Sequence, residues 1–311
     1  MERILLIGGA GFIGSNIAKY LINKESKVFM LELLSSDVSI FEPIPNNLKI
    51  YYGKLSDYDF IKEIIVDNSI ETVIHLASGL LPSSSFESYL LEFDTIIKPT
   101  IKLVQLFSEL NIKLVYFSSG GTVYGNGNNA FSEFHKTEPI SYYGQSKLII
   151  EESIKFEGRR LGLKYLIVRP SNPYGVGQKL NGQQGLIATS IGHILNNEKI
   201  CIWGDGEVVR DYIHIEDLVK GLVGILENGF DNDVYNIGSG IGYSINEIIA
   251  VLRKCVDKDF EVEYVEGRKV DVPNLVLNVE KFGDIFKTSK ISIEQGIRDF
   301  YVHEKNKIKN S

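Results

Sequence analysis

Tyr143 and Lys147 have the residue types and the spacing of an acid/base pair. They lie four residues apart in YGQSK, and on a helix that spacing places two side chains on one face. A tyrosine with a pKa of about 10 is a poor base at neutral pH, but a nearby lysine ammonium favours the phenolate, and a shift of about 3 units needs roughly 4 kcal/mol. Tyrosine and lysine also meet on helices by chance, so the residues around the pair decide what it means.

A second candidate site lies near the start of the chain, where Gly8, Gly11 and Gly14 fall within GGAGFIGS. A strand-like run precedes these glycines and a helix-like segment follows them. In that context glycines allow a tight turn, the approach of a pyrophosphate and close helix packing, and the helix N-terminus attracts an anion. The cluster could also be only a turn, but its context favours a dinucleotide site.

Glu32 ends the second predicted strand and bears on the kind of dinucleotide. A carboxylate there accepts hydrogen bonds from an adenosine ribose and would repel a 2′-phosphate, which favours NAD over NADP. The alternative is a solvated strand end without a ligand.

Short runs of β-branched and aromatic residues alternate with segments of helical periodicity, a pattern typical of parallel α/β folds. We expect strands at residues 3–8, 27–31, 48–52, 72–77, 113–118 and 164–169. We expect helices at residues 14–22, 57–66, 86–110, 143–161, 185–196, 214–226, 244–255 and 292–301. The pattern predicts an α/β fold with a Rossmann-like doubly wound parallel sheet.

The rhythm of strands and helices changes after residue 169, which suggests two domains. We expect residues 1–170 to form the NAD-binding Rossmann domain. Residues 171–311 are expected to form a smaller, partly intertwined substrate-binding region, with some segments returning to the Rossmann domain. The polar stretch from residue 303 to the end is expected to fray.

Composition argues against several classes of protein and site. The net charge of −7 argues against a nucleic-acid partner. No run approaches the roughly 18 apolar residues of a membrane helix, and the N-terminus does not resemble a signal peptide. Cys201 and Cys255 lie far apart without metal-ligand spacing, which argues against a disulfide framework or a metal site. We therefore expect a cytoplasmic protein with no metal and no membrane partner.

Eight segments together resemble the extended short-chain dehydrogenase/reductase family, and most closely its NAD-dependent nucleotide-sugar epimerases and dehydratases. The segments are GGAGFIGS, VIHLAS, SSGGTVYG, YGQSK, RPSNPYG, WGDGEVVRDYIHIEDL, YNIGSG and EGRKVD. The resemblance covers nearly the whole chain. It implies an isomerase that uses NAD to invert C4 of a UDP-hexose, either UDP-glucose/UDP-galactose or an N-acetylated form, through a transient 4-keto intermediate.

The resemblance also implies roles for individual residues. Tyr143 would take the proton of the sugar 4-hydroxyl, and Lys147 would hold the nicotinamide ribose and lower the tyrosine pKa. NAD would take the C4 hydride and return it to the other face of the rotated 4-keto sugar. The residues expected to contact NAD are Gly8, Gly11, Phe12, Ile13, Gly14, Glu32, Leu76, Ala77, Ser118, Tyr143 and Lys147.

By the same likeness five residues hold the nucleotide of the UDP-sugar: Asn172, Leu186, Trp203, Arg210 and Arg268. Two guanidinium groups suit a diphosphate, and an aromatic face suits a base. The two arginines could instead form surface ion pairs with neighbouring aspartates, and Trp203 could be part of a core. For His75 and His214, which end a strand and begin a helix, structural roles are favoured over catalysis.

This chain departs from the family pattern beside the catalytic pair. Gly120 stands where the family has a serine or threonine whose hydroxyl bonds the sugar 4-oxygen. That hydroxyl could come from Ser119, Thr122, a serine at 83–85 or water, and we predict Thr122 as the third catalytic residue. Three other residues differ from the usual cofactor contacts: Lys54, Leu80 and Ile96.

The residues beside Tyr143 also bear on the reaction. Nucleotide-sugar 4,6-dehydratases of this family carry T-D-E at residues 120–122, and the related decarboxylases favour a glutamate at the last of these positions, where this chain has Gly-Gly-Thr. Epimerisation is therefore favoured, with a dehydratase, decarboxylase or reductase of the same family as the alternative. A non-catalytic NAD- or sugar-sensing protein is the alternative of another class. The family likeness further suggests a homodimer built from the helices at 86–110 and 143–161.

Overall fold

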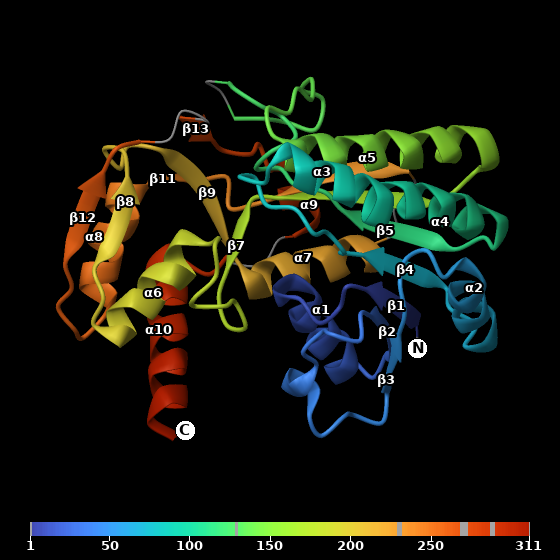
Figure 1. Cartoon of the computed structure of the whole chain (residues 1–311), viewed down its shortest axis with the longest axis horizontal. Helices are drawn as coiled ribbons and strands as arrows, with labels where there is room; N and C mark the ends of the chain where they lie inside the picture. The colour runs from blue at the N-terminus through green and yellow to red at the C-terminus, as the bar shows by residue number, and fades with distance from the viewer. Residues whose placement is uncertain (1, 128–129, 229–231, 268–272, 287–289, 311) are drawn as a thin grey trace. The chain divides into compact units, whose positions relative to one another are not determined.

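The computed structural model describes residues 2–127, 130–228, 232–267, 273–286 and 290–310. The chain divides into two compact units. Unit 1 comprises Met1–Val123, Pro139–Arg169 and Ile225–Tyr235, and unit 2 comprises Tyr124–Glu138, Pro170–Gly224 and Asn236–Ser311. Each unit is therefore assembled from stretches that are separated in the sequence, as the colours of Figure 1 show.

The largest sheet has seven strands in the order β10-β6-β5-β4-β1-β2-β3. Its strands are β1 Arg3–Ile7, β2 Lys27–Glu32, β3 Leu48–Tyr52, β4 Thr72–His75, β5 Lys113–Phe117, β6 Tyr165–Pro170 and β10 Asp233–Ile237. Parallel pairs join β1 to β2 and to β4, β2 to β3, and β5 to β4 and to β6. The strand order reverses at β1, which is the doubly wound arrangement that the sequence predicts. The predicted fold class is confirmed.

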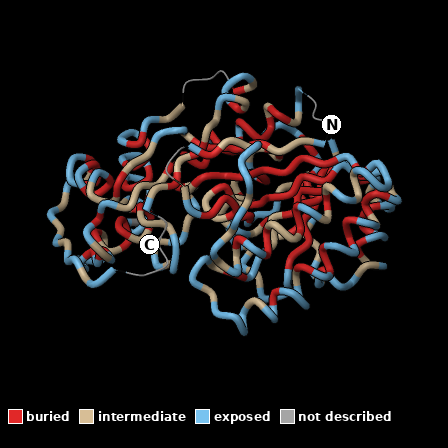
Figure 2. Tube along the Cα trace, turned by 90° about the horizontal axis from the view of Figure 1, so that it is seen from above, coloured by how far each residue is buried: buried red, intermediate tan, exposed pale blue. Residues whose placement is uncertain are grey.

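Most of these strands form where apolar residues follow one another with little interruption, because helices cover the sheet. In β1, Ile4, Leu5 and Leu6 are fully buried, and the strand interiors are red in Figure 2. The helices of this unit include α1 Phe12–Asn23, α2 Tyr58–Asp67, α4 Lys98–Glu109 and α5 Tyr142–Leu161, with a short helical turn η1 at Ser39–Phe41. Helices α4 and α5 pack side by side (Figure 1).

The helix predicted at residues 86–110 is three elements rather than one. They are α3 Phe86–Glu92, a π-helical turn η2 Phe93–Ile97, and α4. Pro99 at the start of α4 has no N–H to donate, and its ring conflicts with the carbonyl one turn earlier, so a regular α-helix cannot continue through it. A π turn absorbs such an irregularity, and π turns are frequent at functional sites.

Unit 2 has two small sheets and a core of its own. Its strands are β7 Asn172–Tyr174, β8 Ile200–Trp203, β9 Val209–His214, β11 Gly242–Ser244, β12 Val262–Val265 and β13 Asn274–Leu275. Strand β9 pairs with β7, β11 and β13, and β8 pairs with β12. The helices are α6 Leu186–Asn196, α8 Ile245–Cys255, α9 Glu280–Ile285 and α10 Ile293–Asn310, while α7 Ile215–Glu227 runs from unit 2 into unit 1. The core gathers residues such as Ile191, Leu252 and Phe300.

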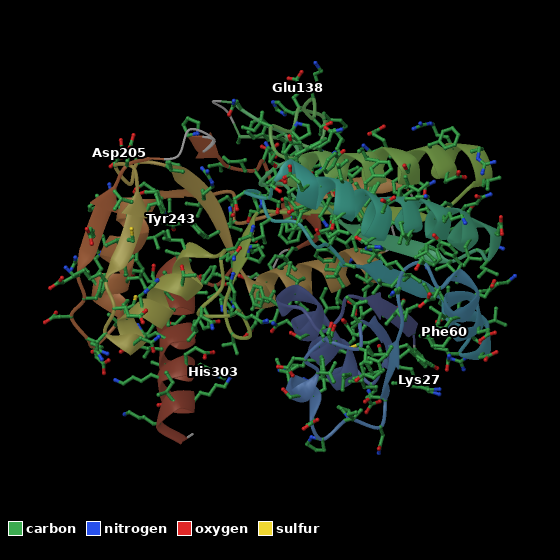
Figure 3. All side chains as sticks on the ribbon, in the orientation of Figure 1. Lys27, Phe60, Glu138, Asp205, Tyr243 and His303 are labelled. Atoms are coloured by element: carbon green, nitrogen blue, oxygen red, sulfur yellow. The ribbon has the colours of Figure 1, made fainter. Side chains whose placement is uncertain are left out.

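The expectation that the chain frays from residue 303 is wrong, because α10 continues to Asn310. The Tyr301 hydroxyl donates to Asp257 Oδ1 at 2.6 Å, Lys305 pairs with the same carboxylate, and Glu304 is buried. These contacts hold the polar turns of the helix, where His303 is labelled in Figure 3. Among the described residues no helix combines the length and the apolarity needed to cross a membrane.

Candidate active site

The glycine-rich turn after β1 is shaped by close approaches that side chains would block. Gly8 has a φ of 81°, and a Cβ there would lie 3.0 Å from the Ala77 nitrogen. A Cβ at Gly14 would lie 2.7 Å from the Gly9 Cα. Gly11 differs, since its Cβ would meet only the Gly8 oxygen at an ordinary 3.6 Å. The turn therefore needs Gly8 and Gly14 for its own packing and leaves room beside Gly11.

Helix α1 begins at this turn without a side-chain cap. Gly11 is the N-cap residue, and the first turn carries no acidic side chain. Unpaired amide groups and the positive end of the helix dipole make such an N-terminus a site for an anion. The predicted cofactor contacts Phe12 and Ile13 are half-buried at the start of α1, and Leu76 and Ala77 are half-buried just after β4.

Glu32, at the end of β2, is tied to the same turn. Its Oε1 accepts a hydrogen bond from the Ala10 amide at 2.6 Å, and its Oε2 accepts one from the Ser36 hydroxyl at 2.9 Å. Burial raises the pKa of this carboxyl, and the two hydrogen bonds oppose that shift. The carboxylate thus stands beside the glycines, where the sequence predicts the adenosine ribose.

The start of α5 brings Tyr143 close to the residues that follow β5. Ser141 caps the helix, its Oγ accepting from the Gly144 amide at 3.1 Å. A Cβ at Gly144 would lie 2.5 Å from the Thr122 carbonyl oxygen, so only glycine permits this approach. One turn later, Lys147 Nζ lies 5.5 Å from the centroid of the Tyr143 ring, as the i, i+4 spacing predicts.

The Lys147 side chain is buried close to the Tyr143 ring. Its Nζ donates to the Phe117 carbonyl oxygen at 3.0 Å. Burial lowers the pKa of Lys147 to about 8, while the negative charges of Glu92 and Glu151 oppose that shift. The lysine therefore still carries its proton at neutral pH.

The Tyr143 hydroxyl is paired with Ser119. Burial raises the pKa of Tyr143 to about 12, the hydrogen bond with the Ser119 side chain opposes that shift, and the charge of Glu92 adds to it. Thr122 Oγ1, by contrast, is buried and has no hydrogen-bond partner among the described residues. Of the hydroxyls that could replace the one missing at Gly120, the structure brings Ser119 to the phenol, whereas the part predicted for Thr122 stays a prediction.

The hydroxyl of Ser118, a predicted cofactor contact, forms a hydrogen bond to another side chain of the protein. Its Oγ donates to Glu151 Oε1. Arg169 donates to both oxygens of the same carboxylate, from Nε at 3.0 Å and from Nη2 at 2.6 Å. Glu151 and Arg169 are almost completely buried. This bidentate pair fixes α5 to β6 beneath the site, and the sequence analysis does not identify it.

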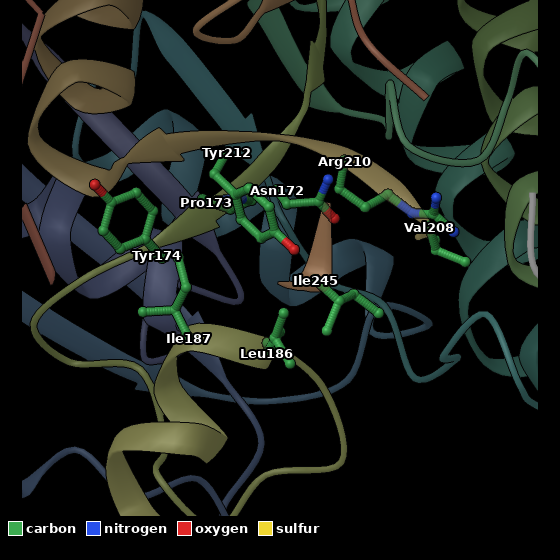
Figure 4. Close-up of a pocket in the computed structure, with 10 residues that line it drawn as sticks. Asn172, Pro173, Tyr174, Leu186, Ile187, Val208, Arg210, Tyr212 and Ile245 are labelled. Atoms are coloured by element: carbon green, nitrogen blue, oxygen red, sulfur yellow. The ribbon is translucent and has the colours of Figure 1, made fainter. Parts of the chain in front are cut away.

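A pocket in unit 2 is lined by three of the predicted substrate residues, Asn172, Leu186 and Arg210, and by some of their neighbours. Its lining includes Asn172 on β7, Arg210 and Tyr212 on β9, Leu186 at the start of α6, and Ile245 (Figure 4). The Asn172 Nδ2 donates to the Asp211 carbonyl oxygen at 2.8 Å, which fixes the amide between the paired strands. The pocket lining thus includes a guanidinium, an amide and the two phenols of Tyr174 and Tyr212 among otherwise apolar side chains.

The other two predicted substrate residues are Trp203 and Arg268. Trp203 is not among the described residues that line this pocket, and its side chain is 47% exposed at the end of β8. Arg268 lies outside the described residues. No group of three or more potential metal ligands occurs within the described part of the chain.

The two histidines have the surroundings of structural residues. His75 is fully buried, its Nε2 lies 3.0 Å from Thr100 Oγ1, and burial lowers its pKa to about 3. Burial also lowers the pKa of His214. A neutral buried imidazole suits packing better than proton transfer at neutral pH.

A family model described as the NAD-dependent epimerase/dehydratase family matches residues 4–238. The chain belongs to this family.

Known members of the NAD-dependent epimerase/dehydratase family match almost the whole chain. A UDP-glucose 4-epimerase of Streptococcus mutans is 31% identical, with 91% of this chain and 90% of the relative covered. A dTDP-4-dehydro-6-deoxyglucose reductase of Escherichia coli is 30% identical, with 89% of both chains covered. The crystal structure of UDP-glucose 4-epimerase from Thermotoga maritima with UDP-glucose matches with a TM-score of 0.91 at 30% identity, covering 98% of this chain and 99% of the other.

This family member also contains a buried acidic residue that the sequence analysis does not single out. Glu92, the last residue of α3, is 3% exposed. The signal in the sequence is its place at helical spacing between Tyr89 and Ile96, which puts a carboxylate between two large hydrophobic side chains. Of the three departures at usual cofactor positions, Leu80 is buried, Ile96 is half-buried against the core, and Lys54 is exposed.

Proposed function

We propose that this protein is an NAD-dependent 4-epimerase that inverts C4 of a UDP-hexose through a transient 4-keto intermediate. The observation that carries the proposal is the cluster at the end of β5. Tyr143 is hydrogen-bonded to Ser119 with the Lys147 ammonium beneath it, and residues 120–122 contain no carboxylate. An acid/base tyrosine without a second acid or base favours a reaction that only removes and returns a hydride.

The residues around the glycine turn fit NAD. The packing at Gly8 and Gly14, the space beside Gly11 and the uncapped N-terminus of α1 provide a place for a pyrophosphate. Glu32 would accept hydrogen bonds from the adenosine ribose and disfavour a 2′-phosphate. NAD bound by these residues would supply a hydride acceptor and donor for C4 of the sugar and a positive charge in its oxidised form.

Tyr143 would act as the base that takes the proton of the sugar 4-hydroxyl. Lowering its pKa from about 12 to about 7 corresponds to roughly 7 kcal/mol, so the phenol needs more cationic stabilisation than the protein alone provides. Lys147 supplies one cation, because it is still protonated at neutral pH. When the hydride returns to C4, Tyr143 gives its proton back to the C4 oxygen, and the enzyme regains its starting state.

The unit 2 pocket would hold the nucleotide of the substrate. Arg210 offers a guanidinium that suits the diphosphate, and Asn172 and Tyr212 offer hydrogen bonds to it or to the sugar. Leu186 contributes apolar surface. Trp203 and Arg268 remain predicted contacts to uracil and to the diphosphate.

The test is incubation of the purified protein with NAD and a panel of UDP-sugars, followed by product separation and mass spectrometry. We expect a product of the same mass as the substrate, inverted at C4, with no net NADH. Loss of water or carbon dioxide would identify a dehydratase or decarboxylase and contradict the proposal. The Escherichia coli relative makes a reductase the second candidate, and stoichiometric oxidation of NADH with a 4-keto sugar would support it instead.

We also propose that the protein is a homodimer. Helices α3, α4 and α5, with the turn η2, lie together and carry exposed apolar side chains, among them Phe86, Leu90, Leu91, Phe93 and Phe156. Apolar surface gathered on adjacent helices is typical of a subunit interface.

For the compartment we propose the cytoplasm. The thiols of Cys201 and Cys255 are free, which fits a reducing environment.

A further inference from the structure

Glu92 is a buried carboxylate that holds the chain after β4. It accepts a hydrogen bond from the Ser78 hydroxyl at 3.2 Å, and the Gly79 amide donates to its Oε2 at 3.0 Å and to its Oε1 at 3.2 Å. A Cβ at Gly79 would lie 2.8 Å from Glu92 Oε2, so glycine at this position permits the contact. The Glu92 carboxylate therefore packs closely against the loop at Gly79. This loop residue lies two positions after the predicted cofactor contact Ala77.

The same carboxylate lies where helices bring it towards the predicted catalytic pair. Helix α3 and the turn η2, which meet at Glu92, both pack against α5, the helix that carries Tyr143 and Lys147. The titratable groups that its charge reaches are Lys147 and Tyr143 on α5 and Tyr116 on β5. Glu151, the other carboxylate near Lys147, is already bound by Arg169. Glu92 has no ion-pair partner within 4 Å among the described residues, so its charge is less compensated than that of Glu151.

We propose that Glu92 is a positioning residue of the reaction, which fixes the loop at Ser78 and Gly79 and sets the electrostatic field at the Tyr143–Lys147 pair. This inference rests on the proposed function, because it concerns the base of that reaction. Burial raises the pKa of the Glu92 carboxyl, and the hydrogen bonds donated by the Gly79 amide and the Ser78 hydroxyl oppose that shift because they favour the ionised form. Its negative charge then keeps the proton on Lys147, whose ammonium the phenolate needs, and also holds the proton on Tyr143.

The test compares the pH profile of kcat/KM for the wild type and Glu92→Gln, which keeps the shape of the side chain and removes the charge. Removing a negative charge lowers the pKa of every neighbouring group. Both limbs of the profile should therefore move to lower pH, the acidic limb through Tyr143 and the alkaline limb through Lys147. The ratio of wild-type to variant activity should rise as the pH increases from about 7 to about 9.

Matched variants separate charge from structure. Glu87→Gln removes an exposed carboxylate from the same helix and should leave the profile unchanged. Glu92→Asp keeps the charge, but its shorter side chain no longer reaches the Gly79 amide. It should therefore lower kcat and move the limbs of the pH profile less than Glu92→Gln does. Gly79→Ala alters an exposed loop and pushes the carboxylate aside, so it should move the limbs in the same direction as Glu92→Gln even if the latter folds poorly. Limbs that stay in place in both Glu92→Gln and Gly79→Ala overturn the proposal.

A measurement without turnover distinguishes this inference from the proposed function. NMR of isotope-labelled tyrosines in the NAD-bound protein follows the ionisation of Tyr143, with Tyr143→Phe assigning its signal. The pKa of Tyr143 should be lower in Glu92→Gln than in the wild type. An unchanged value rejects the role of Glu92 whether or not any UDP-hexose is epimerised. Absence of epimerisation together with the shifted value would reject the proposed reaction alone.

Discussion

At the scale of single residues, the proposed mechanism assigns the role of base to one phenolic oxygen, that of Tyr143. Tyr143→Phe removes the proton acceptor and leaves the ring in place, so we expect kcat to fall by about 10²-fold or more while NAD stays bound. Tyr142→Phe is the matched control, because Tyr142 is the preceding residue, its ring stacks on Tyr89 and its side chain is partly exposed. Product formation and retained NAD are measured on both proteins. Turnover close to that of the wild type in Tyr143→Phe would rule out the assigned base.

The hydroxyl beside that oxygen can be assigned by a second pair of variants. Ser119→Ala removes the hydrogen bond to Tyr143, which is worth about 1 to 1.5 kcal/mol, so kcat should fall roughly tenfold. Thr122→Val keeps the shape and removes a hydroxyl that has no partner among the described residues. We expect a smaller loss for Thr122→Val, as measured by steady-state kinetics. The opposite order would support the prediction that Thr122 is the third catalytic residue.

At the scale of elements, the contact of β4 with α4 makes stability depend on pH. His75 on β4 is buried and neutral beside Thr100 on α4, with a pKa of about 3 against 6.5 when unfolded. The unfolded chain binds this proton first as the pH falls, so the stability present above pH 6.5 is lost progressively towards pH 3. Between about pH 7 and about pH 4 this group alone should cost roughly 3 kcal/mol.

Denaturant unfolding at the two pH values checks this expectation. His75→Gln, which keeps a polar group near Thr100, should lose less stability on acidification than the wild type. The exposed His303→Gln should lose as much as the wild type. Equal losses in wild type and His75→Gln would mean that another group causes the acid sensitivity.

The sequence predicts the elements of unit 1 well because their signals are local. The six predicted strands are mainly apolar runs, and Ser141 and Gly162 mark the ends of α5. Strand β10, which contains Asp233 and Asn236, lacks such a run and was not predicted. The π turn was missed because periodicity alone does not show how a chain accommodates Pro99. The helical end of α10 was missed because it depends on Asp257, which is distant in sequence.

The candidate site is harder to predict from the sequence than the fold is. The spacing of Tyr143 and Lys147 is a local property of a helix and predicts their contact. The partner of the tyrosine is not local, because it depends on how closely Gly144 lets α5 approach Thr122. Glu92 reaches the pair only through the packing of α3 on α5, which no spacing in the sequence reveals.

At the scale of the whole molecule, the proposed homodimer can be tested on the exposed helices of unit 1. Leu91 on α3 is 65% exposed, and a charge there should oppose burial against a second copy. We expect Leu91→Asp to elute as a monomer in size-exclusion chromatography with light scattering, where the wild type elutes as a dimer. Leu34→Asp is the control, since Leu34 is 85% exposed in the loop after β2. A monomeric wild type would contradict the proposal.

The interleaved assembly of the two units has a consequence for synthesis on the ribosome. Strand β10, beside β6 at the edge of the large sheet, is formed by residues that leave the ribosome well after β6. Translation proceeds at roughly 5–20 residues per second, so for several seconds the edge of β6 carries unpaired backbone groups. A nascent chain in that interval is open to pairing with other chains. A fragment that ends at residue 170 would keep that open edge permanently, and it should aggregate where the full chain folds.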